Sequence, residues 1–338
     1  MPGARRYQAQ VIRSVVYAPY HLRSFVLYPS LYFHQGPVQS PHPTDKSVST
    51  ARALSLNSME VKIFCPWWGH EHLDIAVFCQ QIKEAGYDGI DCWIPGEPTV
   101  KHRLFDALQK QELLLVAHQH QAHGAKFDDF KASFLHYLQW SAEGNPILIN
   151  SHTGRDYFSF RQNLELIDIA QEFSQKQGVP VLHETHRGRM GFSPGHLKEY
   201  LDARPELVIT ADFSHWVCVT ESFLENFNDT LQEAIGHTRH VHARIGYEEG
   251  PQVPDPRAPE WKYAVDSFLH WWDQVFNNRL HAGASFLGFT TEFGPPPYMP
   301  VIPFTRQPVA DQFAINCYLK DLLRNRYKDA ITAPSGMI

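Results

Sequence analysis

Short apolar runs alternate with longer segments of helical periodicity through most of this chain, and this alternation restricts its possible folds more than any other feature. The alternation begins at Met59 of the 338-residue sequence and repeats eight times. Short runs rich in β-branched and apolar residues are typical of buried strands, whereas a period of 3.6 residues is typical of amphipathic helices. The predicted strands are residues 60–65, 87–93, 113–118, 146–150, 179–183, 207–211, 239–243 and 286–291.

The segments between these strands predict helices. They are residues 73–85, 104–110, 127–142, 160–177, 197–201, 223–235, 261–276 and 309–326. Eight strand–helix units in roughly 270 residues match the size of a closed (β/α)8 TIM barrel, and this α/β fold is our prediction. The alternative is an open, doubly wound sheet. That fold needs a Gly-rich phosphate turn after its first strand, but the sequence there is Cys-Pro-Trp-Trp-Gly.

The first 58 residues differ in composition from the rest of the chain. They contain six Lys or Arg residues and a single acid, Asp45, which gives them a net charge of +5. Because the whole chain carries −6, residues 59–338 carry −11. We therefore predict a disordered or non-native N-terminal extension over residues 1–58, with an organelle transit segment as the alternative. The barrel is predicted over residues 59–330 and a C-terminal tail over 331–338.

Composition also narrows the partners and the compartment. No apolar run reaches eighteen residues, so we predict no membrane partner. The five Cys residues form no C-x-x-C pair and lie mostly in apolar runs, which favours buried thiols in a reducing, cytoplasmic compartment. The charge of −11 on the predicted barrel opposes a nucleic-acid partner, which requires basic groups. The 20 His residues suit metal binding or proton transfer.

In a (β/α)8 barrel the catalytic side chains lie at the C-terminal ends of the strands. Each predicted strand of this chain ends in or is followed by His, Trp, Asp or Glu. Four of these residues belong to the fifth to eighth strands in order: Glu184, Asp212, His242 and Glu292. Adjacent strands bring them to one half of the barrel mouth. We therefore predict that they bind one divalent metal ion, Mn²⁺, Mg²⁺, Co²⁺ or Zn²⁺.

Further polar and aromatic residues at the strand ends are predicted to bind the substrate. They are Trp67, Trp93, His118, His120, His152, His186, Arg187, His215 and Arg244. Together with Trp68, the two tryptophans suit an apolar wall for a sugar ring, and the two arginines suit a carboxylate or phosphate. The three residues from the third and fourth strands, His118, His120 and His152, are expected opposite the cation. Packing, salt bridges and structural hydrogen bonds remain the alternatives for each.

The order of these motifs resembles the xylose-isomerase-like TIM barrel superfamily. The matching motifs, within residues 60–325, are His-Glu-Thr-His at Glu184, Asp-x-x-His at Asp212, His-Val-His at His242 and Thr-Glu-Phe-Gly at Glu292. The superfamily includes sugar phosphate isomerases, ketose 3-epimerases, inosose dehydratase and endonuclease IV. The resemblance implies that these four residues ligate the metal, that His215 contacts a substrate oxygen, and that the protein is a possible homo-oligomer.

The sequence departs from two members of this superfamily. The ketose 3-epimerases carry Asn-Arg and a further Glu after the first metal-binding Glu, whereas this chain has Arg187, Gly188 and Met190. The two-metal isomerases carry Asp-x-Asp near the seventh strand, whereas this chain has His-Ala-Arg at residues 242–244. The expected chemistry is therefore proton transfer with one metal ion.

These residues predict a divalent-metal-dependent isomerase or epimerase that acts on a small sugar or sugar derivative. Glu184 and Glu292 would flank the substrate carbon and move the proton through a metal-bound enediolate. If a β-hydroxyl leaves instead, the same residues support a dehydratase or another lyase of a sugar or inosose. An endonuclease IV-like nucleic-acid enzyme and a non-catalytic binding barrel are the alternatives from other functional classes.

Overall fold

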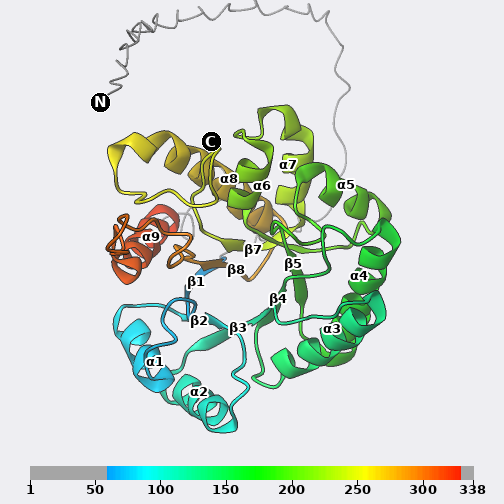
Figure 1. The fold of residues 1–338 in the computed structure, drawn as a ribbon, viewed down its shortest axis with the longest axis horizontal. Helices are drawn as coiled ribbons and strands as arrows, with labels where there is room; N and C mark the ends of the chain where they lie inside the picture. The colour runs from blue at the N-terminus through cyan, green and yellow to red at the C-terminus, as the bar shows by residue number, and fades with distance from the viewer. Residues whose placement is uncertain (1–58, 329–338) are drawn as a thin grey trace, which may run out of the picture. The chain divides into compact units, whose positions relative to one another are not determined.

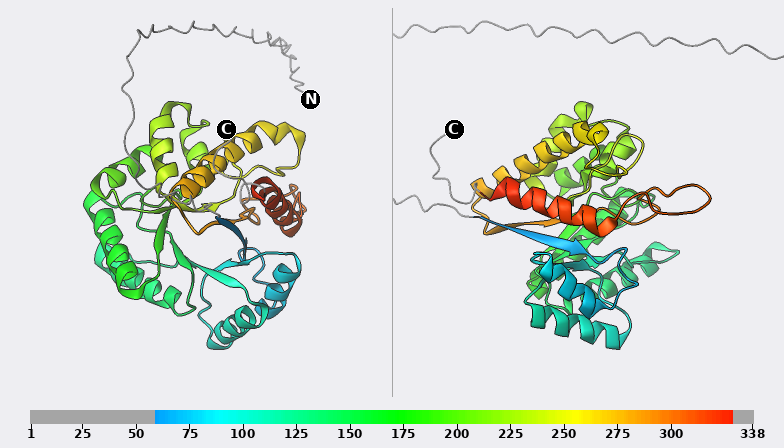
Figure 2. Two further views of the ribbon diagram at one scale, coloured as in Figure 1. Left: turned by 180° about the vertical axis from the view of Figure 1, so that it is seen from behind. Right: turned by 90° about the vertical axis from the view of Figure 1, so that its left-hand side faces the viewer.

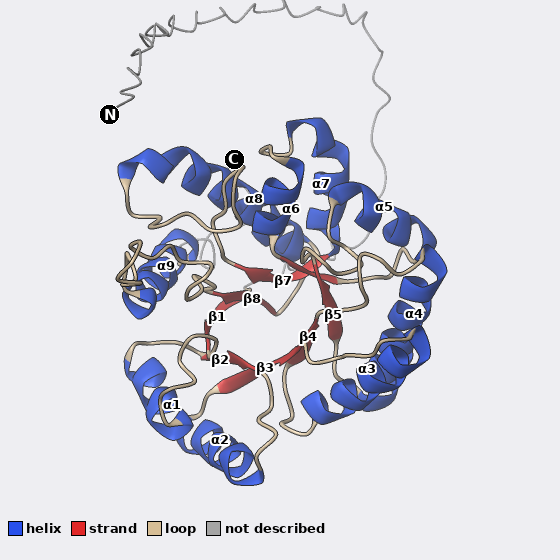
Figure 3. Ribbon diagram, in the orientation of Figure 1, coloured by secondary structure: helices blue, strands red, loops and turns tan. Residues whose placement is uncertain are grey.

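A ring of parallel strands surrounded by helices forms the part of the chain that the computed structural model describes, residues 59–328 (Figure 1). The eight strands pair in sequence order, and β1 (Glu60–Pro66) pairs with β8 (Phe286–Thr290) to close the barrel. Figure 3 shows the strands as the inner ring and the helices outside it. The predicted (β/α)8 barrel is confirmed. The predictions for residues 1–58 and 331–338 lie outside the described residues.

The remaining strands each overlap the range predicted from the sequence. They are β2 (Gly89–Cys92), β3 (Leu114–Gln119), β4 (Leu148–Ser151), β5 (Val181–Glu184), β6 (Ile209–Ala211) and β7 (Thr238–His242). Almost all their residues are buried, because the interior of the barrel covers one side of each strand and the helices cover the other. Continuous apolar runs, rather than alternating ones, are therefore the pattern that predicts them.

The helices cover the outside of the barrel. They are α1 (Ile75–Glu84), α2 (Pro98–Gln111), α3 (Phe127–Ala142), α4 (Phe160–Gln177), α5 (Pro194–Ala203), α6 (Phe213–Thr220), α7 (Asn228–His237), α8 (Lys262–His281) and α9 (Gln312–Tyr327), with 3-10 helices η1 (Glu225–Phe227) and η2 (Pro259–Trp261). Helix α9 returns to β1 (Figure 2), where Arg324 Nη1 donates a 3.0 Å hydrogen bond to the carbonyl of Val61. Among residues 59–328, no helix combines the length and apolar character needed to cross a bilayer.

Helix α6 was not predicted from the sequence. It begins directly after β6, where the Asp212 side chain accepts a 3.1 Å hydrogen bond from the backbone N–H of Ser214 and caps the helix. The pattern predicted a helix from residue 223, but α7 begins only at Asn228. Helix α6 is short and apolar on nearly all sides, so it has no amphipathic period to reveal it.

A layer of large side chains fills the barrel below the site. The rings of Phe64 and His240 meet edge to face there, with centroids 5.8 Å apart. Glycines on β2 and β8, the two strands that pair with β1, make room for them. A Cβ atom on Gly288 would lie 2.4 Å from Nδ1 of His240, and one on Gly89 would lie 2.7 Å from the Phe64 ring. These two glycines are therefore required by close packing.

Substituting Gly288 with alanine tests this packing. Because the added methyl group overlaps His240, Gly288→Ala is expected to lower the free energy of unfolding by about 1–3 kcal/mol. The control is Gly236→Ala in α7, where a Cβ atom meets nothing within 4 Å. That change is expected to raise stability by up to ~1 kcal/mol. Urea unfolding followed by circular dichroism measures both, and equal midpoints for the two variants would contradict the close approach.

Candidate metal centre

The strands direct polar side chains into the upper part of the barrel. Alternate residues of a strand point to the same side, so every second residue faces the interior. Asn150 on β4 and His242 on β7 come from strands that are not neighbours, yet Nδ2 of Asn150 lies 3.4 Å from Nε2 of His242. Such a contact is possible only across the interior. The two-residue period of the strands therefore directs the side chains of the site into the interior of the barrel.

Glu184, Asp212, His242 and Glu292 converge at one point of this interior. Glu184 and His242 end β5 and β7, Asp212 caps α6, and Glu292 follows β8. All four are buried, and each offers a ligand atom within 4.8 Å of the others. Nδ1 of His242 lies 2.6 Å from Oε2 of Glu292 and 3.7 Å from Oε1 of Glu184. The structure thus brings together the four residues that the sequence selected.

The unsatisfied atoms of this cluster fit a bound cation. Three buried atoms make no well-aligned hydrogen bond: Oε1 of Glu184, Nδ1 of His242 and Oε2 of Glu292. The His242 and Glu292 atoms lie at ion-pair distance from each other. Leaving a buried polar atom without a hydrogen bond costs about 1–3 kcal/mol. Three carboxylates and one imidazole are a donor set for Mn²⁺, Mg²⁺, Co²⁺ or Zn²⁺. One such ion would satisfy all three atoms.

Arg244 and His242 balance much of the negative charge of the three carboxylates. Nη2 of Arg244 lies 3.0 Å from Oδ2 of Asp212 and 2.8 Å from Oε2 of Glu292. Burial raises the pKa of Asp212 to about 6, with Arg244 opposing the shift and Glu292 and Glu184 adding to it. For Glu292, attraction to Arg244 and His242 outweighs burial and lowers the pKa. Arg244 is therefore paired with acids of the site rather than free for an anionic substrate.

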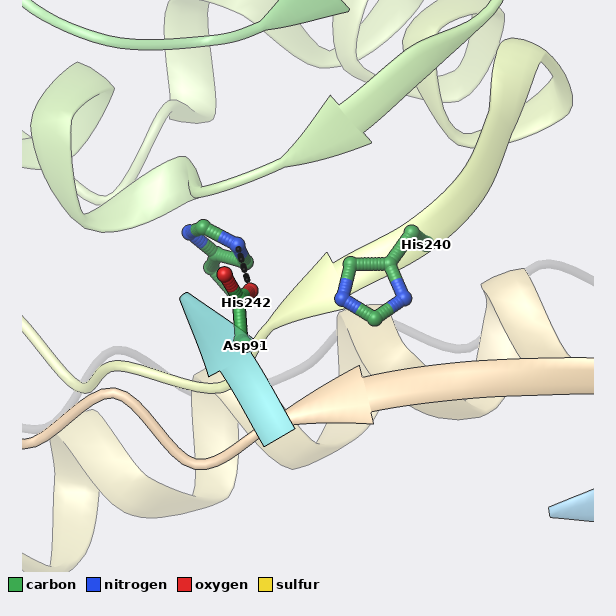
Figure 4. Close-up of side chains that lie close together, drawn as sticks. All are labelled: Asp91, His240 and His242. Atoms are coloured by element: carbon green, nitrogen blue, oxygen red, sulfur yellow. Dashed lines mark ion pairs between the residues drawn. The ribbon is translucent and has the colours of Figure 1, made fainter. Parts of the chain in front are cut away.

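Asp91 on β2 holds the far side of the His242 ring. Its Oδ2 lies 3.2 Å from Nε2 of His242 (Figure 4). The same oxygen accepts a 2.8 Å hydrogen bond from Oγ1 of Thr290. Thr290 Oγ1 also lies 2.8 Å from Nε2 of His240. Burial opposes ionisation of Asp91, but hydrogen bonds with His118 and His242 outweigh it and lower the pKa. A carboxylate on one ring nitrogen fixes the orientation of a metal-binding histidine.

His118 and His152 lie beside Glu184, not opposite the cluster as expected. Nε2 of His152 is 3.0 Å and Nε2 of His118 is 3.8 Å from Oε2 of Glu184. Nδ2 of Asn150 donates a 2.6 Å hydrogen bond to the same oxygen. Burial raises the pKa of Glu184, but His152 and His242 outweigh it and hold the pKa well below its ordinary value. The barrel is narrow enough for side chains of the third and fourth strands to contact Glu184 on the fifth.

A cavity of about 370 Å³ opens next to the cluster. This volume lies in the range of small-molecule sites. Its wall contains Trp68, Trp93, His120, His186 and Tyr298, together with His118, His152 and Arg244. Burial lowers the pKa of both His120 and His186 to about 4, so these two rings are neutral at pH 7.

Three predicted substrate-binding residues lie outside this wall. Trp67 is buried and packs against Trp93, with ring centroids 4.9 Å apart and ring planes tilted by 34°, so it supports the wall from behind. His215 is fully buried, and its Nε2 lies 3.5 Å from Oδ2 of Asp212. The guanidinium of Arg187 lies over the ring of Tyr298, 4.9 Å from its centroid.

Sequence reasoning missed two strand residues, Asp91 and Asn150, and one wall residue, Tyr298. Asp91 and Asn150 each lie inside an apolar strand two positions before a selected residue, so the period of two would have identified both. Trp68, which the sequence grouped with Trp67 and Trp93 as an apolar wall, lines the cavity. Tyr298 lies in a proline-rich segment after β8, from which no single residue was selected on the sequence.

Neither a protein-family model nor a curated protein matches the sequence. Solved structures do match. A 3-keto-D-glucoside 4-epimerase from E. coli is 13% identical with a TM-score of 0.55, over 79% of this chain and 100% of that one. A xylose isomerase-like TIM barrel protein from Mycobacterium smegmatis in complex with magnesium is 8% identical with a TM-score of 0.52, over 80% and 98%. The chain has the xylose-isomerase-like barrel fold.

A third match is a probable 3-DHS dehydratase involved in petrobactin synthesis from Bacillus anthracis. It is 17% identical with a TM-score of 0.51, over 79% of this chain and 100% of that one. At these identities the matched structures share a fold with this chain, and their activities are properties of those proteins. The site of this chain therefore has to be argued from its own residues.

Thermal stability measured with and without a divalent cation tests the cluster. A free cation at 100 times its Kd stabilises the folded protein by about 2.7 kcal/mol. We expect Mn²⁺ to raise the Tm of the wild type but not that of Glu184→Gln, which loses one charged ligand. The matched control is Glu172→Gln, an exposed position on α4, which should respond as the wild type does. An equal response of Glu184→Gln would contradict the ligand assignment.

Proposed function

We propose that this chain is a metal-dependent enzyme that moves a proton next to a carbonyl group of a small sugar or sugar derivative, as an isomerase or epimerase. The observation that carries the proposal is the convergence of Glu184, Asp212, His242 and Glu292 beside a cavity of about 370 Å³. The named activity of the E. coli structure, a 3-keto-D-glucoside 4-epimerase, supports it. So does the magnesium in the Mycobacterium smegmatis structure.

The four converging residues would hold one divalent cation. A cation at such a position supplies a Lewis acid for a carbonyl or hydroxyl oxygen of the substrate. Glu184 and Glu292 belong to β5 and β8, which are separated by two strands of the barrel. Their carboxylates would therefore approach a bound carbon from different directions, as exchange of a proton between two faces requires.

The state of these two carboxylates suits proton removal. The pKa of Glu184 is held well below its ordinary value because His152 and His242 outweigh burial, and the pKa of Glu292 is lowered by Arg244 and His242 against the same burial. Both groups are therefore ionised at neutral pH. An ionised carboxylate within reach of an acidified C–H accepts its proton.

The wall of the cavity suits an uncharged substrate. Trp68, Trp93 and Tyr298 offer aromatic surface for the C–H face of a sugar. His120 and His186 are neutral at pH 7 because burial lowers the pKa of each to about 4. Neutral imidazoles donate to or accept from hydroxyl groups without adding charge. Since Arg244 is paired with acids of the site, we infer that the group bound here is a neutral polyol rather than a phosphate.

A dehydratase is the second candidate. It begins with the same proton removal and differs only in the loss of a β-hydroxyl. The match to a probable 3-DHS dehydratase from Bacillus anthracis supports this second candidate. The two candidates give different products from one incubation, so a single experiment separates them.

Proton exchange in D₂O tests the reaction class. Protein loaded with Mn²⁺ or Mg²⁺ is incubated with a panel of sugars, keto-sugars, sugar acids and inososes, the cation is removed, and NMR follows the C–H signals. We expect one panel member to lose a C–H signal next to a carbonyl, and a chelator to stop the loss. Inversion or a moved carbonyl identifies an epimerase or isomerase, and a new vinylic signal identifies a dehydratase.

Variants test whether the C–H exchange depends on the metal centre. Glu292→Gln is expected to slow the exchange by about 10²–10⁴-fold, the usual contribution of a general base. Glu172→Gln on the surface of α4 should leave the rate unchanged. Absence of exchange with every panel member in the cation-loaded wild type would overturn the proposed reaction.

A further inference from the structure

One level of the barrel interior consists of polar side chains. In a (β/α)8 barrel the inward residues of alternate strands form layers of four side chains, in which Val, Ile and Leu dominate. The layer directly below the candidate metal centre comes from β2, β4, β6 and β8 and contains Asp91, Asn150, Thr210 and Thr290. All four residues are buried. Packing of the barrel alone does not account for four polar residues at this level.

Three members of this layer contact each other or the metal centre. Oγ1 of Thr290 donates a 2.8 Å hydrogen bond to Oδ2 of Asp91. Nδ2 of Asn150 donates a 2.6 Å hydrogen bond to Oε2 of Glu184. Oδ2 of Asp91 and Nδ2 of Asn150 lie 3.2 Å and 3.4 Å from the same atom, Nε2 of His242. The carboxylate and the amide therefore lie close together in the middle of the barrel.

Three oxygen atoms of the layer make no hydrogen bond to any of the described residues. They are Oδ1 of Asp91, Oδ1 of Asn150 and Oγ1 of Thr210. Nδ1 of His118 lies 3.5 Å from the Asp91 atom, at ion-pair distance, but a carboxylate oxygen accepts more than one hydrogen bond. Buried polar atoms almost always have a partner in the protein or in ordered water. Three such atoms in one layer therefore indicate a molecule that binds between them.

We propose that one buried water molecule binds in this layer, between Asp91, Asn150 and Thr210. Water would donate to the two Oδ1 atoms, which only accept, and accept from Oγ1 of Thr210, which donates. A buried water typically makes about three hydrogen bonds to polar groups that otherwise lack a partner. The cavity reaches Asp91, so solvent has a route to the layer. The inference does not rest on the proposed function, because it involves neither the metal nor a reaction.

The surroundings favour water over a monovalent cation. The only acid of the layer, Asp91, already lies at ion-pair distance from His118 and His242. Its Oδ2 keeps a proton on Nε2 of His242. That N–H and the amide N–H groups of Asn150 both present positive charge beside the proposed site. A cation there would be repelled by both groups, whereas water turns its oxygen or its hydrogens toward each neighbour as needed.

The water would also fix the side chain of Asn150. The amide has donors at one end and an acceptor at the other, so a half turn would bring Oδ1 against the carboxylate of Glu184. A hydrogen bond from water to Oδ1 favours the observed orientation, in which Nδ2 donates to Oε2 of Glu184. The other oxygen, Oε1, then stays 3.7 Å from Nδ1 of His242, on the side of the candidate metal centre. The water thus positions Glu184 through Asn150.

Crystal diffraction from the full-length protein tests the site directly. Crystals are grown with Na⁺ as the monovalent cation and again with Rb⁺ in its place, and data from the second are collected at the rubidium absorption edge. We expect one density peak in both crystals, at hydrogen-bond distance of roughly 2.5–3.0 Å from the three oxygen atoms, without an anomalous signal. Absence of the peak would overturn the proposal, and so would an anomalous peak at this position in the Rb⁺ crystals.

Thr210→Val tests the same site in solution, because it removes the hydroxyl group and keeps the shape of the side chain. If water binds there, one hydrogen bond is lost, and the Tm should fall by about 2–4 °C. If Oγ1 has no partner, its removal is neutral or stabilising. Thr290→Val gives the scale, because its hydroxyl has partners at 2.8 Å in both Asp91 and His240, and it should lower the Tm at least as much. A Tm of Thr210→Val equal to or above that of the wild type would contradict the bound water.

Discussion

The buried carboxylate of Glu184 is the group on which the rest of the site depends. An ion removed from water is tolerated only when charges and hydrogen bonds replace its hydration. Asn150 and His152 contact one oxygen of Glu184, while the other oxygen faces His242 and has no hydrogen-bond partner. The first oxygen is thus satisfied by the protein, and the second is directed at a place where a cation completes the balance.

Barrel closure makes these contacts possible. Strands from the two ends of the sequence pair as neighbours, so β2 and β7 both direct residues into the same narrow interior. Asp91 and His242 meet there although 150 positions separate them in the numbering. Glycines at positions 89 and 288 admit large rings below this level, and the charged groups occupy the level above. The fold and the chemistry of the site therefore follow from the same geometry.

The sequence predicted the barrel and the four converging residues because both depend on local patterns: buried strands, and polar residues at their C-terminal ends. It did not predict which side of the cluster His118 and His152 occupy, since that depends on strand tilt and barrel width. Asp91 was missed although its strand period indicated an inward position. Helix α6 was missed because a short buried helix lacks an amphipathic pattern.

Anomalous diffraction from crystals grown with Mn²⁺ tests the central claim most directly. We expect a strong anomalous peak at bonding distance from Glu184, Asp212, His242 and Glu292, with Oε1 of Glu184 among the ligands. Crystals that contain Mn²⁺ but show no peak there, with the four side chains joined to each other by direct hydrogen bonds, would contradict the account.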